Sequence, residues 1–259
     1  MSETIHIISL GAGVQSSTMA LMAAKGEITP MPEFAVFADT GDEPAEVYHW
    51  LAKLRELLPF RVKIAHRDII YGKLSDNLVQ WEHSQIPAYF KNPNGTIGIG
   101  KRQCTKHWKI VPVQRKIREA TDTQRKRLPD GYVTLWQGIS IDEVSRAKDS
   151  REPWITHRFP LLELRMNRND CEAWLRKHGL SAPKSACVYC PYRSNAQWRT
   201  SKANPKEWDL ITRIEQQLSA RGEFLHPSCK LLSEVDFSTE EDRGQMNLFE
   251  NECDGMCGV

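Results

Sequence analysis

The segment IHIISLGAGVQSSTMALMAAKG, residues 5–26, constrains the fold more than any other part of the chain. An apolar run rich in β-branched residues ends at a glycine turn, and small hydroxylated residues then lead into Ala, Leu and Met at helical spacing. A strand, a turn and a helix in this order bring backbone N–H groups and the positive end of a helix dipole to one point. The segment therefore predicts a phosphate-binding loop. The alternative is a glycine turn that only packs a helix closely on a strand.

Two common nucleotide motifs do not fit this turn. No lysine follows Gly11 and Gly13 as a P-loop requires, and no third glycine stands at the spacing of a dinucleotide-binding fingerprint. The turn is therefore expected to hold phosphate in another way.

The rest of the chain alternates between strand-like and helix-like segments. Such alternation predicts an α/β fold with an open, doubly wound, mostly parallel sheet, whose ligands bind beyond the carboxyl ends of the strands. Residues 71–102 break the rhythm and predict a long loop near the site. Strands are expected at 5–10, 33–38, 60–65 and 132–139, and helices at 16–25, 45–57, 106–120, 169–178 and 205–221.

Composition excludes several classes of protein. The 259 residues are 40% hydrophobic and 26% charged with a net charge of +2, which is ordinary for a globular protein and unlike a disordered one. We expect no signal peptide and no membrane span, and hence a cytoplasmic protein. The seven cysteines are then expected as thiols that bind metal or take part in catalysis. Two regions are expected: a nucleotide-binding α/β domain, 1–180, and a helical, cysteine-bearing extension packed on it, 181–259.

Four ordered segments resemble one family. Residues 9–17, SLGAGVQSS, are similar to the pyrophosphate loop (PP-loop) of adenine-nucleotide α-hydrolases, and 37–51, FADTGDEPAEVYHWL, to a stretch of phosphoadenosine phosphosulfate (PAPS) reductases. Residues 102–113 and 138–148 resemble two further reductase segments. The chain thus resembles the PAPS reductase-like branch of the PP-loop superfamily. The resemblance implies that the phosphates and the nucleotide are held by Ser9, Gly11, Ala12, Gly13, Val14, Gln15, Ser16, Ser17, Asp39, Thr40 and Gly138.

The departures from the family pattern bear on the chemistry. Gln15 replaces the PP-loop aspartate, Ser140 stands where the reductases carry an arginine, and Thr105 replaces the second of two paired cysteines. These changes weaken a role in sulfate assimilation. Ser16 and Ser17 keep the hydroxyls typical of ATP-cleaving members, and they favour a nucleoside triphosphate.

The cysteines suggest a metal centre. Cys187 and Cys190 form a CxxC turn, a spacing that allows two thiolates to bind one metal ion or cluster. The resemblance adds Cys104 as a third ligand of a 4Fe-4S cluster, with Cys229, Cys253 or Cys257 as the fourth; Cys257 is our first choice. A structural zinc site is the alternative. Cys253 can instead be a redox thiol of a C-terminal tail.

The resemblance implies an enzyme that binds ATP or a PAPS-type adenine nucleotide, with magnesium as a further option, for sulfur-related chemistry. A thiol donor protein and a homo-oligomer are partners that this implies. The alternatives are ATP-dependent modification of a nucleic acid, by tRNA thiolation or DNA phosphorothioation, and a zinc-bearing nucleotide-binding module without turnover. The residues expected to act in catalysis are Asp39, Lys109, Asp142, Arg146 and Cys253.

Overall fold

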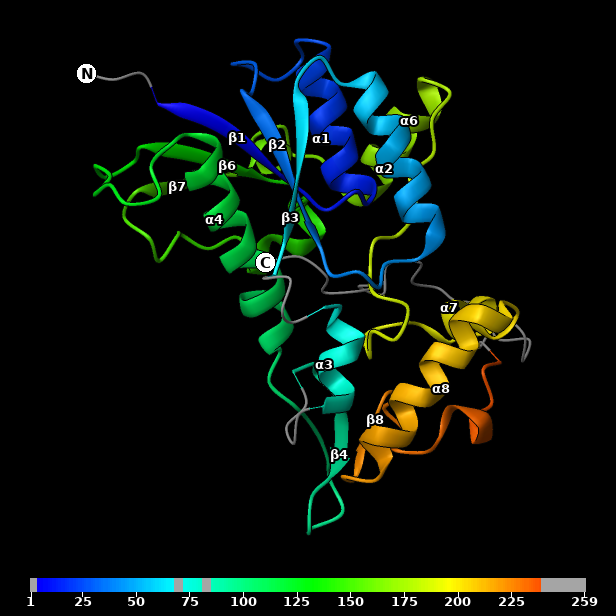
Figure 1. Ribbon diagram of the computed structural model, residues 1–259. Coiled ribbons are helices and arrows are strands. Elements are labelled where there is room, and N and C mark those ends of the chain that lie inside the picture. Colours follow the sequence, from blue (N-terminus) through cyan, green and yellow to red (C-terminus); the bar gives the residue numbers. More distant parts are fainter. Residues whose placement is uncertain (1–3, 68–71, 81–84, 239–259) are drawn as a thin grey trace.

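A five-stranded parallel sheet forms the centre of the upper part of the molecule (Figure 1). The computed structural model describes residues 4–67, 72–80 and 85–238. The strand order is β3-β2-β1-β6-β7, so β1 lies in the middle. The chain adds β2 and β3 on one side of β1 and then β6 and β7 on the other side, which confirms the predicted open, doubly wound sheet. The strands are β1 (Ile5–Leu10), β2 (Phe34–Asp39), β3 (Arg61–His66), β6 (Val133–Gln137) and β7 (Ile155–Arg158).

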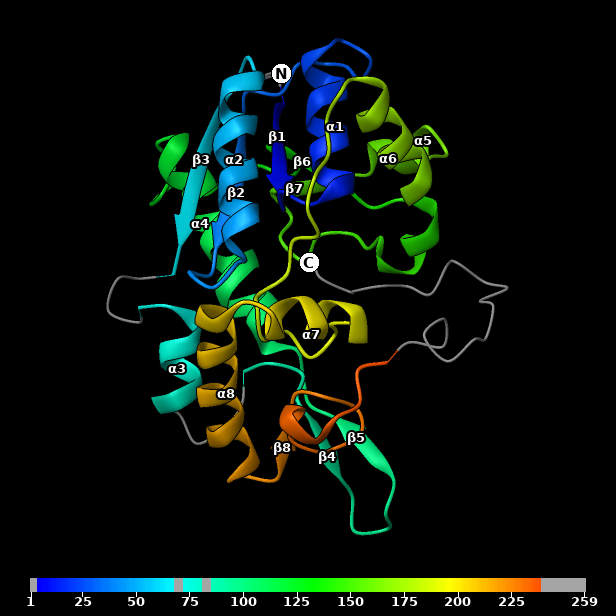
Figure 2. The same cartoon turned by 90° about the vertical axis from the view of Figure 1, so that its right-hand side faces the viewer.

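Helices cover both faces of this sheet because successive strand residues point to opposite sides. Ile8 and Phe37 pack into a cluster with α1, α2 and α6, whereas Ile7 and Val36 pack into another cluster with α4. Figure 2 shows α1, α2 and α6 together on one side of the strands. The helices of this part are α1 (Val14–Ala24), α2 (Ala45–Leu57), α4 (Val111–Ala120), η3 (Ile141–Arg146), α5 (Pro160–Glu163) and α6 (Arg168–Lys177).

The lower part of the molecule combines two distant stretches of sequence (Figure 1). Leu74, Trp108, Tyr189, Ile211 and Leu232 share one buried cluster, so residues before α4 pack with residues after α6. The position of the predicted boundary at residue 180 stays a prediction. The elements here are α3 (Leu74–Gln80), β4 (Tyr89–Lys91), β5 (Ile97–Ile99), η2 (Thr105–Ile110), α7 (Asn195–Lys202), α8 (Pro205–Ser219), β8 (Glu223–Phe224) and η4 (Leu232–Glu234).

The expectation of a long loop over 71–102 was wrong. This stretch contains α3 and the hairpin of β4 and β5, which joins β8 in a three-stranded antiparallel sheet. The predicted helix 106–120 is also divided, because Thr105–Ile110 form a π-helix before α4 begins. Sequence reasoning missed β7, α5 and α7.

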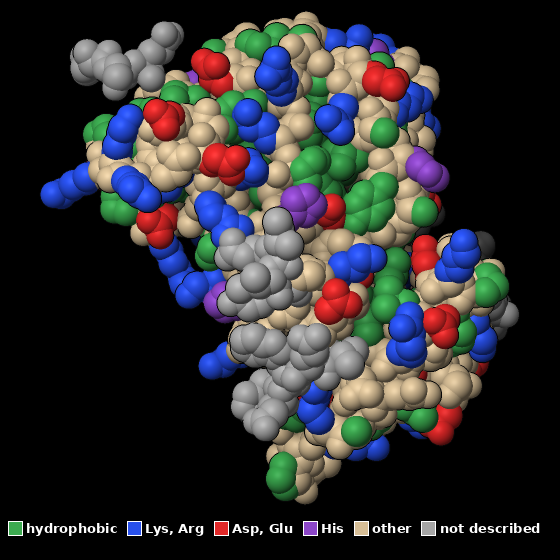
Figure 3. Space-filling view, in the orientation of Figure 1, with side chains coloured by type: hydrophobic (Ala, Val, Ile, Leu, Met, Phe, Trp, Pro, Cys, Tyr) green, Lys and Arg blue, Asp and Glu red, His purple; other side chains and the backbone are tan. Residues whose placement is uncertain are grey.

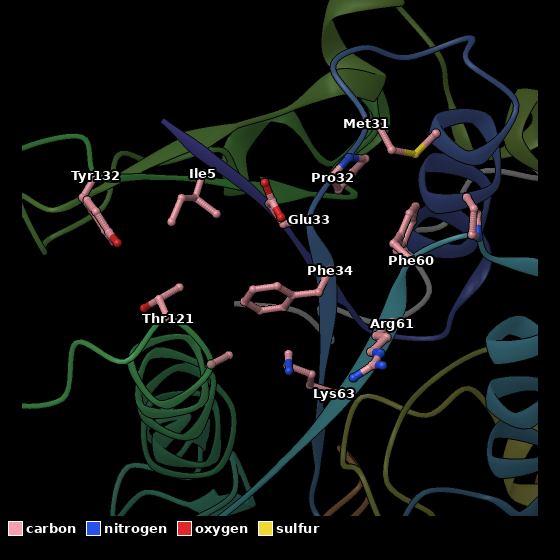
Figure 4. A pocket seen from close by; sticks show the side chains of 12 residues that line it. Ile5, Met31, Pro32, Glu33, Phe34, Phe60, Arg61, Lys63, Thr121 and Tyr132 are labelled. Carbon is pink, nitrogen blue, oxygen red and sulfur yellow. The ribbon is translucent and has the colours of Figure 1, made fainter. Parts of the chain in front are cut away.

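A hollow of about 760 Å³ lies at the opposite edge of the sheet from the glycine turn. Its lining comes from the first residues of β1, β2 and β3 and from the end of α4. Figure 4 shows Phe34 in the middle, with Thr121 and Tyr132 on one side and Phe60 and Arg61 on the other. We call it the amino-edge hollow. In the described part of the chain, no helix is both long and apolar enough to cross a membrane.

Candidate active site

The glycine turn lies where β1 ends and α1 begins. Gly13 is the residue that precedes the helix, Ala12 adopts a left-handed φ of 54°, and among described residues no side chain caps the first turn. Gly11 N donates to Ser16 Oγ at 3.2 Å, so this hydroxyl closes the turn from inside. The uncapped start of an 11-residue helix can receive an anion, because its first N–H groups have no partner within the helix.

The side chains of the other residues predicted for this loop lie partly in the turn and partly in the core. Ser17 is fully buried, and its Oγ accepts from Trp50 Nε1 at 2.9 Å, so its hydroxyl lies in the core. Val14 is buried as well. Gln15 Nε2 lies 3.5 Å from Ser140 Oγ, which joins two of the positions where the sequence departs from the family pattern. Of the two serines, only Ser16 places its hydroxyl in the turn.

Gly138 brings the end of β6 against the same helix start. A Cβ at this position would lie 2.7 Å from Ser16 Cα and 2.8 Å from Ser16 N, closer than real side chains approach backbone. Gly138 is therefore required for close packing, and contact with a nucleotide stays a prediction. Ser9 lies beside Val36 and Gln137 in the sheet register, one strand residue before the turn.

The loop after β2 supplies carboxylates at the same edge. Asp39 Oδ1 accepts from Gly41 N and from Tyr48 Oη, each at 2.8 Å. Its other oxygen lies 3.8 Å from His66 Nδ1. These contacts fix the orientation of Asp39 at the rim, next to Thr40, where a nucleotide bound to the turn would be within reach of the loop.

Asp42 joins this loop to the lower part of the molecule. It is buried and accepts hydrogen bonds from Ser75 N at 2.7 Å, Ser75 Oγ at 2.8 Å and Tyr189 Oη at 2.7 Å. Burial raises the pKa of Asp42 above its ordinary value, and the hydrogen bonds offset part of that rise. Tyr189 belongs to the CxxC turn, so Asp42 holds that turn in place.

The CxxC turn lies directly on the β2 loop. Cys187 Sγ is 3.2 Å from Thr40 Oγ1 and 4.0 Å from Glu43 Oε1, and Val188 N donates to Asp42 O at 3.0 Å. Just before the turn, Ser185 approaches the glycine turn, since a Cβ on Gly13 would lie 3.5 Å from Ser185 Cβ. Cys187 thus lies on the β2 loop, and the segment just before it lies beside the predicted phosphate loop.

Glu43 links the thiol to the predicted cation. Its side chain is 1% exposed, and Oε1 lies 3.8 Å from Lys109 Nζ. Burial, followed by the charge of Glu43, raises the pKa of Cys187 well above its ordinary value, and Lys109 opposes this rise. Sequence reasoning missed Glu43, Tyr48, Ser185 and Tyr189; only the run of acids DTGDE after a strand could have indicated Glu43.

Asp142 and Arg146 both make contacts within the protein. Asp142 accepts from Arg168 N at 3.1 and 3.2 Å, at the first residue of α6. Arg146 pairs with Glu143 at 2.6 Å. Both residues follow β6 on η3, and their predicted catalytic roles stay predictions.

The cysteines test the predicted metal centre. Among the described residues, no group of three or more His, Cys, Asp and Glu side chains is placed to hold a metal ion. Cys187 belongs to the buried cluster of the lower part and Cys104 packs against it, whereas Cys190 is half-buried on the same turn as Cys187. Cys229 is buried in a left-handed turn, with φ of 51°. Cys253 and Cys257 lie outside the described residues, and Cys171 is fully buried in the core as a small apolar residue.

Comparisons with solved structures return proteins of the two kinds that the sequence resembles. One is the phosphoadenylyl-sulfate (PAPS) reductase from Candida auris in a phosphate complex, 12% identical with a TM-score of 0.47 over 70% of this chain and 76% of that one. Another is the U34-tRNA thiolase NcsA from Methanococcus maripaludis with its 4Fe-4S cluster, 14% identical with a TM-score of 0.43 over 90% and 73%. No family model and no curated protein matches by sequence.

The described part of this chain has an open, doubly wound α/β fold whose central strand ends in the glycine turn. The mostly parallel sheet, the glycine turn after β1 and the helix behind the turn agree with the fold expected from the sequence. The activity has to be inferred from the residues of the chain itself.

Proposed function

We propose that this protein is an enzyme that binds an adenine nucleotide at the glycine turn and uses it in chemistry at sulfur. One observation carries the proposal: the CxxC turn packs on the β2 loop, with Cys187 Sγ 3.2 Å from Thr40 Oγ1, beside an uncapped helix start. The alternative, a glycine turn that only packs a helix on a strand, would not require a cysteine-bearing turn beside it.

Each group has a definite task in this proposal. The first N–H groups of α1 bind phosphate oxygens, and their charge stabilisation needs no rearrangement during the reaction. Asp39, held by Tyr48, orients the nucleotide at the rim. Lys109 is positioned by Glu43 at the mouth of the site, where its ammonium group neutralises developing negative charge.

Nucleotide binding is tested with Gly11→Val. A Cβ at Gly11 meets only Ser16 Oγ at 3.6 Å, an ordinary contact, so the fold tolerates a side chain there while phosphate oxygens cannot come close. Isothermal titration calorimetry with ATP, adenylyl sulfate and PAPS should show at least about tenfold weaker binding, and Gly11→Ala an intermediate loss. Unchanged affinity in Gly11→Val, with an unchanged melting temperature, would overturn the proposal.

The kind of sulfur chemistry is tested by product analysis. Sulfite released from an adenylyl sulfate with a thiol donor indicates reduction, whereas pyrophosphate released from ATP indicates activation of an acceptor for sulfur. A 4Fe-4S cluster on Cys104, Cys187 and Cys190 is a further proposal, with zinc as its rival. Iron, sulfide and zinc analysis after anaerobic purification distinguishes the two.

A further inference from the structure

One segment of the chain concentrates its positive charge. Residues 61–118 contain 12 Lys and Arg but 3 Asp and Glu, whereas the rest of the chain contains 23 and 30. The whole chain is nearly neutral because the positive net charge of this segment and the negative net charge of the rest nearly cancel. A basic segment of this kind is the electrostatic footprint of a polyanion partner.

The basic segment forms one continuous flank of the fold. It runs from β3 through α3, the β4–β5 hairpin and η2 into α4, and Figures 1 and 2 show these elements from the sheet down to the hairpin at the lower end. In Figure 3, drawn in the orientation of Figure 1, Lys and Arg side chains are spread over the visible face from the upper part to the lower part. We call this surface the basic flank.

Several cations of the basic flank border the candidate site. The stem of Lys73 lies on Gly41 of the β2 loop, where a Cβ would approach its Cγ to 2.7 Å. Arg102 lies over the ring of Tyr192, with 5.7 Å between guanidinium carbon and ring centre. Lys91 is near enough to Cys229 to affect the pKa of that thiol, which burial raises and Lys91 lowers. These three cations thus lie beside the β2 loop, beside Tyr192 next to the CxxC turn and near Cys229.

Four lysines of the basic flank form no ion pair with a described acidic residue. In the part of the chain that the structure describes, no ion pair is found for Lys73, Lys91, Lys101 or Lys106, and all four are exposed. Partial burial, and then the charges of Arg67 and Lys106, lower the pKa of His107, so like charges lie close together here. Unpaired like charges repel each other, and a bound polyanion removes that cost.

Tyrosines beside the thiols add a second kind of contact. Tyr89 and Tyr192 are half-buried neighbours, and Tyr89 lies near Cys190 and Cys229; burial, then these three groups, raise the pKa of Tyr89. Half-exposed aromatic rings next to cations are the surface on which unpaired bases stack. An acidic peptide would use the cations but not the rings.

We propose that the basic flank binds a nucleic-acid strand and brings an unpaired base to the cysteine side of the candidate site. The strand lies along the flank between Lys73 and the hairpin, with its phosphates on Lys91, Lys101 and Lys106. This inference rests on the proposed function, since it names the acceptor on which the sulfur chemistry acts.

Charge reversal with a matched control tests the proposal. Lys101→Glu/Lys106→Glu reverses two charges of the flank, and Lys25→Glu/Lys177→Glu reverses two exposed lysines at the ends of α1 and α6, on the opposite face of the sheet. Fluorescence anisotropy with labelled 20-nucleotide single-stranded RNA and DNA should show at least about tenfold weaker binding for the flank variant alone. Its log–log salt slope should fall by about one per lysine.

Three results would overturn the proposal: no binding of either strand at low salt, equal losses in both variants, or equally tight binding of poly-glutamate. The last result would identify an acidic protein as the partner. Calorimetry with ATP and adenylyl sulfate on the same variants separates this proposal from the proposed function. If the parent protein binds nucleotide but neither nucleic-acid strand, the basic flank is removed as a docking surface and the nucleotide site is left intact.

Discussion

The two edges of the central sheet differ in what they bring together. The amino-edge hollow measures about 760 Å³ and is lined by apolar rings, scattered charges and helix-end residues. At the carboxyl edge the glycine turn, the β2 loop and the CxxC turn lie together. The hydrogen bonds between the β2 loop and the CxxC turn join residues 147 positions apart in the sequence. In a parallel sheet the direction of the strands, and not the size of a hollow, determines at which edge the ligand-binding loops gather.

The electrostatics of the two edges differ as well. At the amino edge Lys63 lies over the Phe34 ring at 5.2 Å, a contact that stabilises the surface and needs no ligand. At the carboxyl edge Asp42 and Glu43 are both buried, and each has partners from segments far away in sequence. Buried carboxylates are costly unless they are satisfied. Among the described residues, these two buried carboxylates lie at the carboxyl edge, which favours that edge as the candidate site.

The largest effect is expected from Gly138→Val. The new side chain would collide with the backbone of Ser16 and displace the start of α1, so nucleotide affinity should fall by about 100-fold or more. Calorimetry measures the affinity, and a melting curve shows whether the sheet survives. Gly11→Val adds the same side chain without a collision with backbone, so its loss of affinity should be smaller and the sheet should remain intact. Normal affinity in Gly138→Val would mean that phosphates bind elsewhere.

The next largest effect is expected from Asp42→Ala. The change leaves three donors on Ser75 and Tyr189 without their acceptor, two of them from side chains in the lower part of the molecule. The free energy of unfolding should fall by about 2–4 kcal/mol, measured by urea denaturation. Asp209→Ala is the control, because its carboxylate is 69% exposed and pairs only with Arg213 on the same helix among the described residues. A loss below about 0.5 kcal/mol would show that the CxxC turn is held by other contacts.

Local patterns predicted most of the upper part of the fold. The first strand, the glycine turn and the second helix, Ala45–Leu57, were predicted within a few residues, because periodicity is a property of neighbouring residues. The hairpin of β4 and β5 was missed because its strands have three residues each, and its further partner β8 lies beyond residue 220. Strands so short carry no readable alternation.

The candidate site was predicted only in part, for a related reason. The resemblance indicated the turn, the β2 loop and the CxxC as separate motifs, but the contact between Thr40 and Cys187 joins residues 147 positions apart. Ser17 illustrates a finer limit: its hydroxyl faces Trp50 because it lies one helix residue beyond Ser16. The difference between these serines is set by rotation around the helix and by what packs there.

A buried carboxylate away from both edges gives a smaller effect that depends on pH. Glu215 on α8 is 3% exposed and accepts from Leu232 N at 2.9 Å, and burial raises its pKa from 4.5 to about 7. The folded protein therefore binds a proton more tightly than the unfolded chain. Stability from this group is complete below pH 4.5 and is lost as the pH rises through 7.

Glu215→Gln tests this dependence because the amide keeps an acceptor for Leu232 N and has no charge. At pH 8 the variant should be more stable than the parent by about 1–3 kcal/mol, and at pH 4 the difference should vanish. Urea denaturation at several pH values measures this. A constant difference across the range would mean that Glu215 keeps one charge state throughout. Nucleotide affinity should not change, which separates buried carboxylates of the fold from those of the site.

The smallest effect is expected at the amino edge, and it tests the comparison most directly. Arg61 is exposed at the start of β3 and lines the larger hollow, whereas the glycine turn lies at the other ends of the strands. Arg61→Ala should therefore leave the affinity for ATP, adenylyl sulfate and PAPS within about twofold of the parent, and the free energy of unfolding within about 0.5 kcal/mol.

Lys109→Ala, which removes the cation paired with Glu43 at the carboxyl edge, is the matched loss of one positive charge and should weaken binding. If Arg61→Ala weakened binding as much as Lys109→Ala, total charge and not position at the carboxyl edge would govern affinity. The contrast between the two edges would then have no chemical meaning.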